Sequence, residues 1–510
     1  MKSTSNYVYN LSQKFNKIVL ENSNKVAIEY PNNESFTFGE IDILSNKLSN
    51  YLINKGLKTG DVIAIINEKS IFSYSLMIAC IKTGIIYCNI DRDSPIERTK
   101  RIFNNCLPKI IFVDQNIKNP FPKLNKKYNF LFIDKIQNKI EKESNYFKIK
   151  SIDGNSPVYI MFTSGSTGFP KGAVMSNNNL INFIYWGKDT YQIQKTDILT
   201  NLNPIYFDNS VFDFYISIFN GARLLSISHQ LVKNPTELIR VVNLKKCTIW
   251  FSVPSLLVYL LNMKILKKTY FKSIRSFIFG GEGFPKRKLK ELFVLYGTNS
   301  NLYNVYGPTE CTCICSSYKI TSADFENMNE LAPLGFISSN FDYEILSNNN
   351  QNYGELSLRG PCVGLGYYND IDRTNHSFIQ NPKSLWKDIM YKTGDIVEKD
   401  KNGILHFKGR IDNQIKHMGY RIELEEIEAA FYNLKYVLEC GVIYKKINSD
   451  LGYILAVISI SYDKSKEEIL DELDKNLPKY MIPKEIILVD KLIKNQNGKI
   501  DRNYLKKVYG

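Results

Sequence analysis

A glycine- and hydroxyl-rich loop directly after an apolar run is the feature that most constrains this chain. Residues 158–162 are apolar and predict a buried strand, and the loop 163–172 follows without a break. Its glycines let backbone N–H groups approach an anion, its hydroxyls can donate to anionic oxygens, and Lys171 adds a positive charge. Pro170 stands where a Walker loop has its second glycine, so this is a different kind of polyphosphate loop. A flexible Ser/Gly linker is the alternative, although linkers seldom follow a buried strand.

The order of apolar segments predicts the fold class. A chain of 510 residues is too long for one core, so two or more domains are expected. The strands predicted over residues 1–150 are 61–66, 85–90, 110–113 and 130–133. Helical spacing of apolar residues between them predicts an α/β fold with parallel, helix-covered sheets. Short strands with glycine breaks, at 354–360 and 364–368, predict a small β-rich subdomain at about 325–410.

The net charge of +15 at first suggests a nucleic-acid or membrane partner. The basic residues are spread along the chain, however, and the densest cluster, 286–290, has no interleaved aromatic residue. We therefore expect no nucleic-acid partner. No apolar run reaches the length of a membrane-spanning helix, and residues 1–10 have no apolar core, so neither membrane insertion nor a signal peptide is expected.

Nine cysteines are scattered along the chain without a Cys-x-x-Cys pair, which predicts reduced thiols in a cytoplasmic protein. Cys311, Cys313 and Cys315 alternate, so a strand would place all three on one face. A metal site would need further cysteine or histidine ligands nearby, and the sequence shows none.

Further motifs follow the loop in a fixed order. They are Phe207-Asp208-Asn209-Ser210-Val211, then Gly280-Gly281-Glu282, then Asn304-Val305-Tyr306-Gly307-Pro308-Thr309-Glu310, then Thr393-Gly394-Asp395, and finally Asn497-Gly498-Lys499. With the phosphate loop, this order resembles the adenylate-forming superfamily. That superfamily includes acyl-CoA synthetases, luciferases, adenylation domains of nonribosomal peptide synthetases and D-alanine–carrier-protein ligases. The resemblance covers nearly the whole chain.

The resemblance implies an ATP site with Mg²⁺. The nucleotide-binding residues that it implies are Thr163, Ser164, Gly165, Ser166, Thr167, Gly168, Lys171, Gly281, Glu282, Asn304, Val305, Tyr306, Gly307, Pro308, Thr309, Asp395 and Arg410. Tyr306 is expected to stack on adenine, Thr309 to contact the α-phosphate, and Glu310 to hold the metal. Asp395 is the candidate for the ribose hydroxyls, since a carboxylate can accept from both, and Arg410 is a second ribose or phosphate candidate.

The resemblance also implies an amino-acid pocket. Asp208 is expected to neutralise the substrate ammonium, because a buried ammonium needs a counter-charge; a surface aspartate in a loop is the alternative. The pocket residues implied by position are Asp208, Asn209, Phe212, Phe251, Ile278, Gly280, Val305, Cys313, Ile314 and Lys499. Apart from Asp208 and Lys499 this lining is mostly apolar, and Gly280 is expected to leave space. A small-to-medium aliphatic side chain should fit better than a charged one.

The resemblance divides the chain into a large domain, 1–411, and a small mobile α+β domain, 412–510, with a hinge near Asp412. The large domain is expected to contain two helix-covered, mostly parallel sheets and a small β-barrel-like subdomain. Lys499 is the implied catalytic residue, on a mobile loop, because its charge can stabilise phosphate oxygens during attack. Gly419 is the implied passage for a phosphopantetheine arm, which needs close approach to the backbone.

The resemblance thus implies a freestanding ligase that adenylates an amino acid and transfers it to the phosphopantetheine arm of a separate carrier protein. The nearest alternative is a D-alanine–D-alanyl-carrier-protein ligase. Residues 414–416 and 419–428 look very much like those enzymes, although they usually carry cysteine where this chain has Gly280. An acyl-CoA ligase is disfavoured by Asp208, and a non-catalytic nucleotide-binding module by the presence of Lys499 and Glu310.

Overall fold

The computed structural model describes residues 8–115, 117–118, 120–165, 168–328, 331–347, 350–447, 452–462, 464–495 and 500–510. Their contacts divide the chain into two compact units. The first comprises the described parts of Met1–Arg92, Cys106–Met161 and Ala173–Gly409. The second comprises those of Asp93–Asn105, Phe162–Gly172 and Arg410–Gly510.

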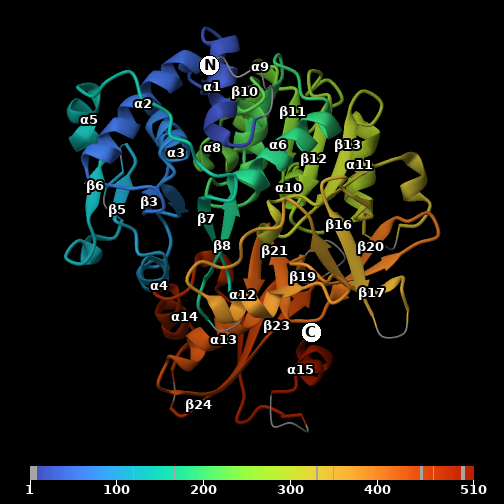
Figure 1. The fold of residues 1–510 in the computed structure, drawn as a ribbon. Helices are drawn as coiled ribbons and strands as arrows, with labels where there is room; N and C mark the ends of the chain where they lie inside the picture. The colour runs from blue at the N-terminus through green and yellow to red at the C-terminus, as the bar shows by residue number, and fades with distance from the viewer. Residues whose placement is uncertain are drawn as a thin grey trace. The chain divides into compact units, whose positions relative to one another are not determined.

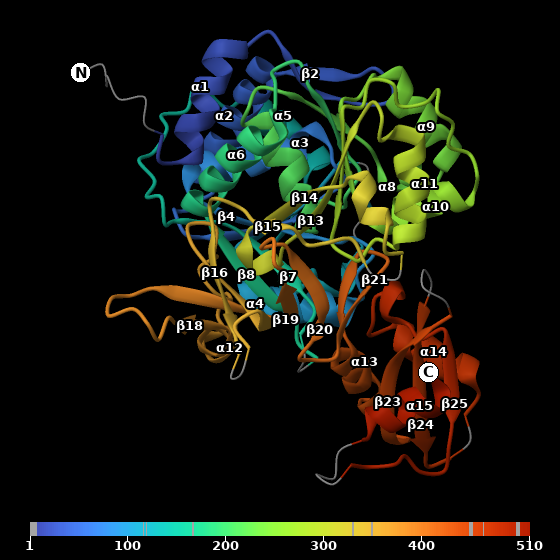
Figure 2. The same cartoon turned by 90° about the vertical axis from the view of Figure 1, so that its right-hand side faces the viewer.

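A nine-stranded sheet is the larger sheet of the first unit (Figure 1). Its strands, in spatial order, are β15 (Phe336–Ile337), β14 (Ser316–Lys319), β13 (Asn301–Tyr306), β12 (Ser276–Gly280), β11 (Ile249–Ser252), β9 (Ile198–Asn201), β10 (Arg223–Ser226), β1 (Val26–Glu29) and β2 (Ser35–Thr37). The pairs from β13 to β1 are parallel, and the edge strands β14, β15 and β2 are antiparallel. The helices that bury one face are α9 (Pro235–Leu244), α10 (Pro254–Asn262) and α11 (Lys286–Tyr296) (Figure 2).

A six-stranded sheet contains the strands predicted from the N-terminal third. In spatial order these are β6 (Phe130–Phe132), β5 (Ile110–Val113), β3 (Val62–Ile66), β4 (Ile86–Ile90), β7 (Pro157–Thr163) and β8 (Lys171–Ser176). The neighbours of β3 are β4 on one side and β5 on the other, and both pairs are parallel. The chain therefore reverses its direction of strand addition at β3, which makes this a topological switch point.

One apolar cluster joins both sheets through helices. The helices that contribute to it are α1 (Leu11–Asn22), α2 (Phe38–Asn54), α3 (Ile71–Thr83), α5 (Ile133–Glu141) and α6 (Asn177–Tyr191). Every residue of α3 is buried, as expected of a helix that is apolar all round and enclosed by other layers. The predicted parallel-rich α/β architecture is confirmed.

The predicted β-rich subdomain is also present. A five-stranded sheet is formed by β16 (Asp342–Leu346), β17 (Tyr353–Arg359), β19 (Ile389–Lys399), β18 (Phe378–Gln380) and β20 (Leu405–Arg410). The strand predicted at 364–368 is wrong, because this segment has only an isolated bridge between Tyr367 and Ala173. The short helices of the first unit are α7 (Asn209–Val211), α8 (His229–Val232) and α12 (Ile371–Ser377).

The C-terminal part of the second unit is a small α+β structure (Figure 2). Its sheet consists of β23 (Val437–Lys446), β24 (Gly452–Ile460) and β25 (Glu485–Leu488). The helices beside it are α13 (Leu424–Tyr432), α14 (Lys466–Asp474) and α15 (Arg502–Tyr509), and a hairpin of β21 (Gln414–His417) and β22 (Tyr420–Glu423) precedes α13. Helix α4 (Ile96–Cys106) lies almost wholly in this unit. Among the described residues, none of the helices combines the length and apolarity needed to span a bilayer.

Candidate functional site

The turn after β13 explains the glycine of the Tyr-Gly-Pro-Thr-Glu motif. A Cβ on Gly307 would lie 2.2 Å from the Cys313 carbonyl oxygen, because the returning chain passes directly over this residue. The Cys315 N–H donates to the Tyr306 carbonyl at 2.8 Å and closes the turn. Thr312 and Cys313 both have positive φ, 54° and 78°, so residues 311–315 do not form a strand that would place the three cysteines on one face. The close return of the chain overrides the alternating pattern, and all three cysteines are buried without sharing a strand face.

The residues predicted to bind adenine and ribose, Tyr306 and Asp395, lie next to each other. Tyr306 ends β13, Asp395 lies in β19, and the tyrosine hydroxyl donates to Asp395 Oδ2 at 2.5 Å. Both side chains are buried. Burial, and then the Asp395 carboxylate, raise the pKa of Tyr306 well above its ordinary value. The phenol therefore stays protonated and donates to the carboxylate.

The residues predicted to bind the substrate ammonium and the α-phosphate, Asp208 and Thr309, also contact each other. Thr309 is buried in the turn after Pro308, and its Oγ1 donates to Asp208 Oδ2 at 2.6 Å. Asp208 is half-buried at the start of α7, so its carboxylate is within reach of solvent and of Thr309. These two residues come from motifs about a hundred positions apart, and the fold brings their functional groups into direct contact.

The apolar side chains assigned to the pocket are part of the large buried core. Six of them belong to the single cluster that joins the two sheets: Phe212, Phe251, Ile278, Val305, Cys313 and Ile314. The Phe212 and Phe251 rings are 4.8 Å apart between centroids and inclined at 64°, an edge-to-face contact. Strand register places Phe251 beside Ile278 and Gly280 beside Val305.

The expectation that Gly280 leaves space is wrong. A Cβ at this position would lie 2.4 Å from the Val305 carbonyl oxygen and 2.6 Å from Val305 Cγ2. Glycine is needed here because the backbone of β13 passes close by, and a larger residue would require that strand to shift. The pocket's preference for a side chain must therefore come from its other walls.

The Gly-Gly-Glu turn and Asn304 have local structural roles. Gly281 has φ +97°, and a Cβ on it would approach Asn209 Nδ2 to 3.3 Å. Glu282 Oε1 accepts from the Ser255 N–H at 2.7 Å, in the first turn of α10, where a carboxylate also interacts favourably with the helix dipole. Asn304 Nδ2 donates to the Pro333 carbonyl at 2.7 Å.

Glu310, the predicted metal residue, is completely buried, and its Oε1 accepts from Tyr367 Oη at 2.7 Å. Sequence reasoning missed Tyr367, which lies in the segment wrongly predicted as a strand. The described part of the chain contains no cluster of three or more His, Cys, Asp or Glu side chains suited to a metal. Mg²⁺ usually keeps several waters and binds one or two carboxylates with substrate phosphates, so a lone Glu310 fits that mode.

The described residues of the phosphate loop lie in the second unit, and their donors face anionic groups. The Gly165 N–H donates to Glu426 Oε2 at 3.2 Å, and Lys171 Nζ lies 3.9 Å from Glu423 Oε1. Ser164 Oγ donates to the Arg421 carbonyl at 2.8 Å. Carboxylate oxygens are anionic acceptors like phosphate oxygens, so this backbone and ammonium group are able to bind anions.

Thr163 adds a second sign of anion binding. Its Oγ1 is buried and has no hydrogen-bond partner in the described part of the chain, so it is a donor ready for an acceptor such as a phosphate oxygen. Gly168 has φ +75°, which explains its glycine. Ser166 and Thr167 lie outside the described residues.

In the predicted hinge segment, Arg410 and Asp412 contact each other. Arg410 Nε and Nη2 contact Asp412 Oδ1 and Oδ2 at 2.5 and 2.6 Å, a bidentate pair. Gly419 has φ +80° and follows Met418 with φ +52°, so the two form the turn of the β21–β22 hairpin. This turn explains the glycine without reference to a ligand. Lys499, the predicted catalytic residue, lies outside the described residues.

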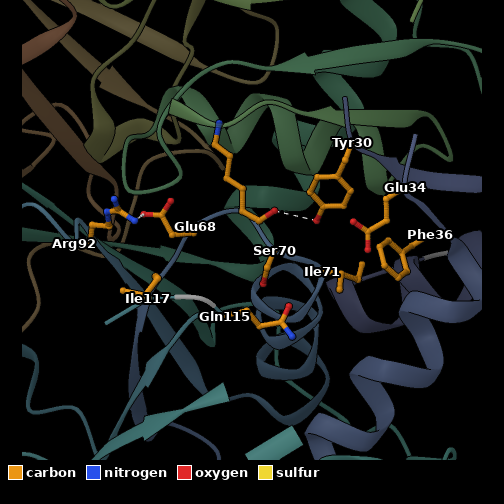
Figure 3. Close-up of a pocket in the computed structure, with 10 residues that line it drawn as sticks. Tyr30, Glu34, Phe36, Glu68, Ser70, Ile71, Arg92, Gln115 and Ile117 are labelled. Carbon is orange, nitrogen blue, oxygen red and sulfur yellow. Dashed lines mark hydrogen bonds and ion pairs between the residues drawn. The ribbon is translucent and has the colours of Figure 1, made fainter. Parts of the chain in front are cut away.

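A separate cavity of about 360 Å³ lies at the carboxyl ends of β3, β4 and β5 (Figure 3). Glu68, Arg92 and Gln115, which follow those strands, line it, and Tyr30, Glu34 and Phe36 come from the β1–β2 hairpin. Arg92 Nη1 pairs with Glu68 Oε1 at 3.0 Å (Figure 3). None of the predicted site residues lines this cavity.

Comparisons with known proteins give matches over most of the chain. Residues 15–368 match the family model described as AMP-binding enzyme, and residues 426–499 match the one described as AMP-binding enzyme C-terminal domain. The chain is 29% identical over 491 residues to D-alanine--D-alanyl carrier protein ligase of Lactococcus lactis, covering 92% of this chain and 94% of that protein. It is 28% identical over 502 residues to surfactin synthase subunit 3 of Bacillus subtilis, covering 98% of this chain and 38% of that protein.

A solved structure shows the same fold. The Vibrio cholerae adenylation domain AlmE, in complex with glycyl-adenosine-5'-phosphate, aligns with a TM-score of 0.83 at 20% identity over 99% of both chains. The predicted resemblance to adenylate-forming enzymes is confirmed by these matches.

Proposed function

Because this chain belongs to the family of AMP-binding enzymes, we propose that it is a ligase that activates an amino acid with ATP and transfers it to a carrier protein. The acceptor in this proposal is the phosphopantetheine thiol of a separate carrier. Two of the relatives above support a carrier acceptor, since one is a D-alanyl carrier protein ligase and the other a peptide synthase subunit. The nine free cysteines suit a reducing compartment, and we propose a cytoplasmic location.

The contact between Asp208 and Thr309 is the observation that carries the amino-acid proposal. In an aminoacyl-adenylate, the ammonium and the phosphorus are separated by only a few bonds. A residue for each group must therefore lie close together, and these two side chains touch at 2.6 Å. A substrate without an amino group would give Asp208 no cationic partner.

The proposed reaction has two steps. An amino-acid carboxylate oxygen bonds to the α-phosphorus of ATP as pyrophosphate leaves, and the carrier thiol, losing its proton, then bonds to the acyl carbon as AMP leaves. Asp208 orients the ammonium, Tyr306 and Asp395 hold the nucleoside, and the Thr163 hydroxyl with Lys171 binds phosphate oxygens. Lys499 stabilises the charge that develops on the α-phosphate. Mg²⁺, held by Glu310, would supply positive charge to the phosphates.

We propose an aliphatic L-amino acid as substrate. The walls formed by Phe212, Phe251 and Ile278 are apolar and buried, so a charged side chain would find no partner there. Selectivity among aliphatic side chains should be modest, because one methylene is worth only about 1–3 kcal/mol.

D-Alanine is the second candidate substrate. The D-alanyl carrier protein ligase of Lactococcus lactis matches this chain over nearly the full length of both proteins. Gly280 does not decide between the two candidates, since it adds no open space.

A pyrophosphate-exchange assay over a panel of L- and D-amino acids tests the proposal. We expect the highest kcat/KM for valine, leucine or isoleucine. Exclusive activation of D-alanine would establish the second candidate. Activation of carboxylic acids without an amino group, at the same kcat/KM, would contradict the role of Asp208.

A further inference from the structure

A buried lysine connects the six-stranded sheet to the nine-stranded sheet. Lys69 follows β3 and is only 7% exposed, and its Nζ donates to the carbonyls of Asn201 and Ile227 at 2.7 and 2.8 Å. These two residues lie at the carboxyl ends of β9 and β10, in the other sheet. Sequence analysis gave no sign of this lysine, because its partners lie far along the chain.

The backbone of Lys69 is strained. Its φ is +63°, a conformation that non-glycine residues seldom adopt. Hydrogen bonds hold it there: its N–H donates to Asn67 Oδ1 at 2.6 Å, and its carbonyl accepts from Tyr30 Oη at 3.0 Å in the wall of the cavity (Figure 3). Strain and a buried charge at one residue both reduce stability, which is the pattern of residues that serve a function.

Asp213 is linked to this lysine through Asn201, whose carbonyl accepts from Lys69 and whose side-chain amide donates to Asp213. It is fully buried, and its Oδ2 accepts from the side-chain amides of Asn201 and Asn203 at 3.0 and 3.1 Å. Its Oδ1 has no hydrogen-bond partner among the residues that the structure describes. Burial raises the pKa of Asp213 to about 7 and lowers that of Lys69 to about 7, and the charge of each opposes the shift of the other.

The same carboxylate reaches both aromatic walls of the candidate pocket. Asp213 directly follows Phe212 and lies in the π-helical turn Phe212–Ile216, a distortion that is common at functional sites. Asn203 Nδ2, which donates to Asp213, also lies 3.3 Å from the Phe251 carbonyl oxygen and donates to it. Through Asn203, one carboxylate thus ties the turn that carries Phe212 to the strand end that carries Phe251.

We propose that Asp213, joined through Asn203 to the strand end that carries Phe251, is a positioning residue that sets the spacing of Phe212 and Phe251. That spacing determines which substrate side chains fit. This inference rests on the proposed function, because it assumes that the two rings line the substrate pocket. Displacing one ring changes the fit of every side chain by a different amount, so the residue acts on selectivity as well as on stability.

The test compares selectivity with stability in matched variants. Asp213→Asn keeps the shape but removes the carboxylate, and Asn203→Ala keeps the carboxylate but removes the link to Phe251. Asp197→Asn is the control, because Asp197 is another buried carboxylate, paired with Arg275 at 2.6 Å before the start of β9. The measurements are the melting temperature and the ratio of kcat/KM for leucine to that for alanine in pyrophosphate exchange.

We expect both Asp213→Asn and Asn203→Ala to change the leucine/alanine ratio by about tenfold, roughly the worth of one methylene. Asp197→Asn should lower the melting temperature and leave the ratio unchanged. If Asp213→Asn does not fold, Asn203→Ala alone decides the question. An unchanged ratio in the folded variants, with melting temperatures lowered as in the control, would show a purely structural role.

Failure of the proposed function would be visible in the wild type first. If wild-type protein activates no amino acid but does activate another carboxylic acid, the same variants are compared on a short and a long member of that class. A changed ratio there would still support the positioning role, and an unchanged ratio would overturn it.

Discussion

The two parts of the predicted site differ in what their polar side chains contact. In the first unit, predicted residues meet each other: Tyr306 contacts Asp395, and Thr309 contacts Asp208. In the second unit, predicted residues contact neighbours that were not predicted, as Gly165 does with Glu426. We propose that the first arrangement is preorganised for a ligand, whereas the second exchanges its partners when it binds one.

Asp208→Ala tests the preorganised part and should have the largest effect. Loss of the counter-charge for a buried ammonium leaves roughly 3–5 kcal/mol uncompensated, so kcat/KM for amino acids should fall by about 10²- to 10⁴-fold. ATP binding, measured by calorimetry, should be unchanged. As a control, 4-methylpentanoate lacks the amino group of leucine, and its slow reaction should not respond to the substitution. Equal losses with both acids would show that Asp208 acts only by holding Thr309.

Lys499→Ala tests the predicted catalytic lysine and should have the second largest effect. A charge that acts mainly in the transition state affects kcat, so adenylation should slow by roughly 10²-fold while ATP affinity changes little. Transfer from pre-formed aminoacyl-adenylate to the carrier should be largely spared. The control is Lys494→Ala, which removes another lysine of the same unit, one that pairs with Glu439. Arg502→Lys is unsuitable as a control, because Arg502 pairs with both Glu425 and Glu428. Wild-type adenylation by Lys499→Ala would refute the assignment.

Glu426→Gln tests the proposed exchange of partners. Its effect should be smaller than those above and in the other direction, since it should strengthen ATP binding. The Glu426 carboxylate accepts from the Gly165 N–H, and we expect it to compete with a phosphate for this donor. A neutral amide oxygen is a weaker acceptor, so ATP should bind about two- to fivefold more tightly. Glu425→Gln is the matched control, because the Glu425 carboxylate accepts from Asn413 and Arg502 and, in the described part of the chain, from no group of the loop. Unchanged or weaker ATP binding by Glu426→Gln would remove the distinction between the two parts.

The sequence predicted those parts of the fold that depend on local pattern. Apolar runs such as 62–66 become buried strands because five consecutive apolar residues cannot remain exposed. The motifs around Asp208 and Tyr306 were identified by their resemblance to adenylate-forming enzymes, which can be seen in short, contiguous stretches of sequence.

Long-range packing explains what the sequence did not predict. The Val305 backbone fills the space expected beside Gly280, and the chain at Cys313 returns directly over Gly307, so residues 311–315 form no strand face. The contact network of Lys69 and Asp213 joins two sheets, so no local pattern could reveal it. In each case the determining contact involves residues that are distant in sequence.

Removing the Arg410–Asp412 pair should have the smallest effect of the changes considered, and the quantity affected is the free energy of unfolding. Burial raises the pKa of Asp412, but the hydrogen bond and charge of Arg410 outweigh it and hold the pKa below the ordinary 3.8. A carboxyl whose folded-state pKa is lowered stabilises the protein above its unfolded-state pKa and loses this effect as the pH falls through the folded-state value.

Since the Asp412 side chain is 44% exposed, the pair should contribute at most about 1 kcal/mol. Urea unfolding should therefore show wild-type protein slightly more stable than Asp412→Asn at pH 7, with the difference shrinking as the pH falls below about 4. A double-mutant cycle with Arg410→Gln isolates the pair. A coupling energy of several kcal/mol between Arg410 and Asp412 would contradict the proposed exchange of partners in the second unit, because a pair held that firmly could not separate at the predicted hinge.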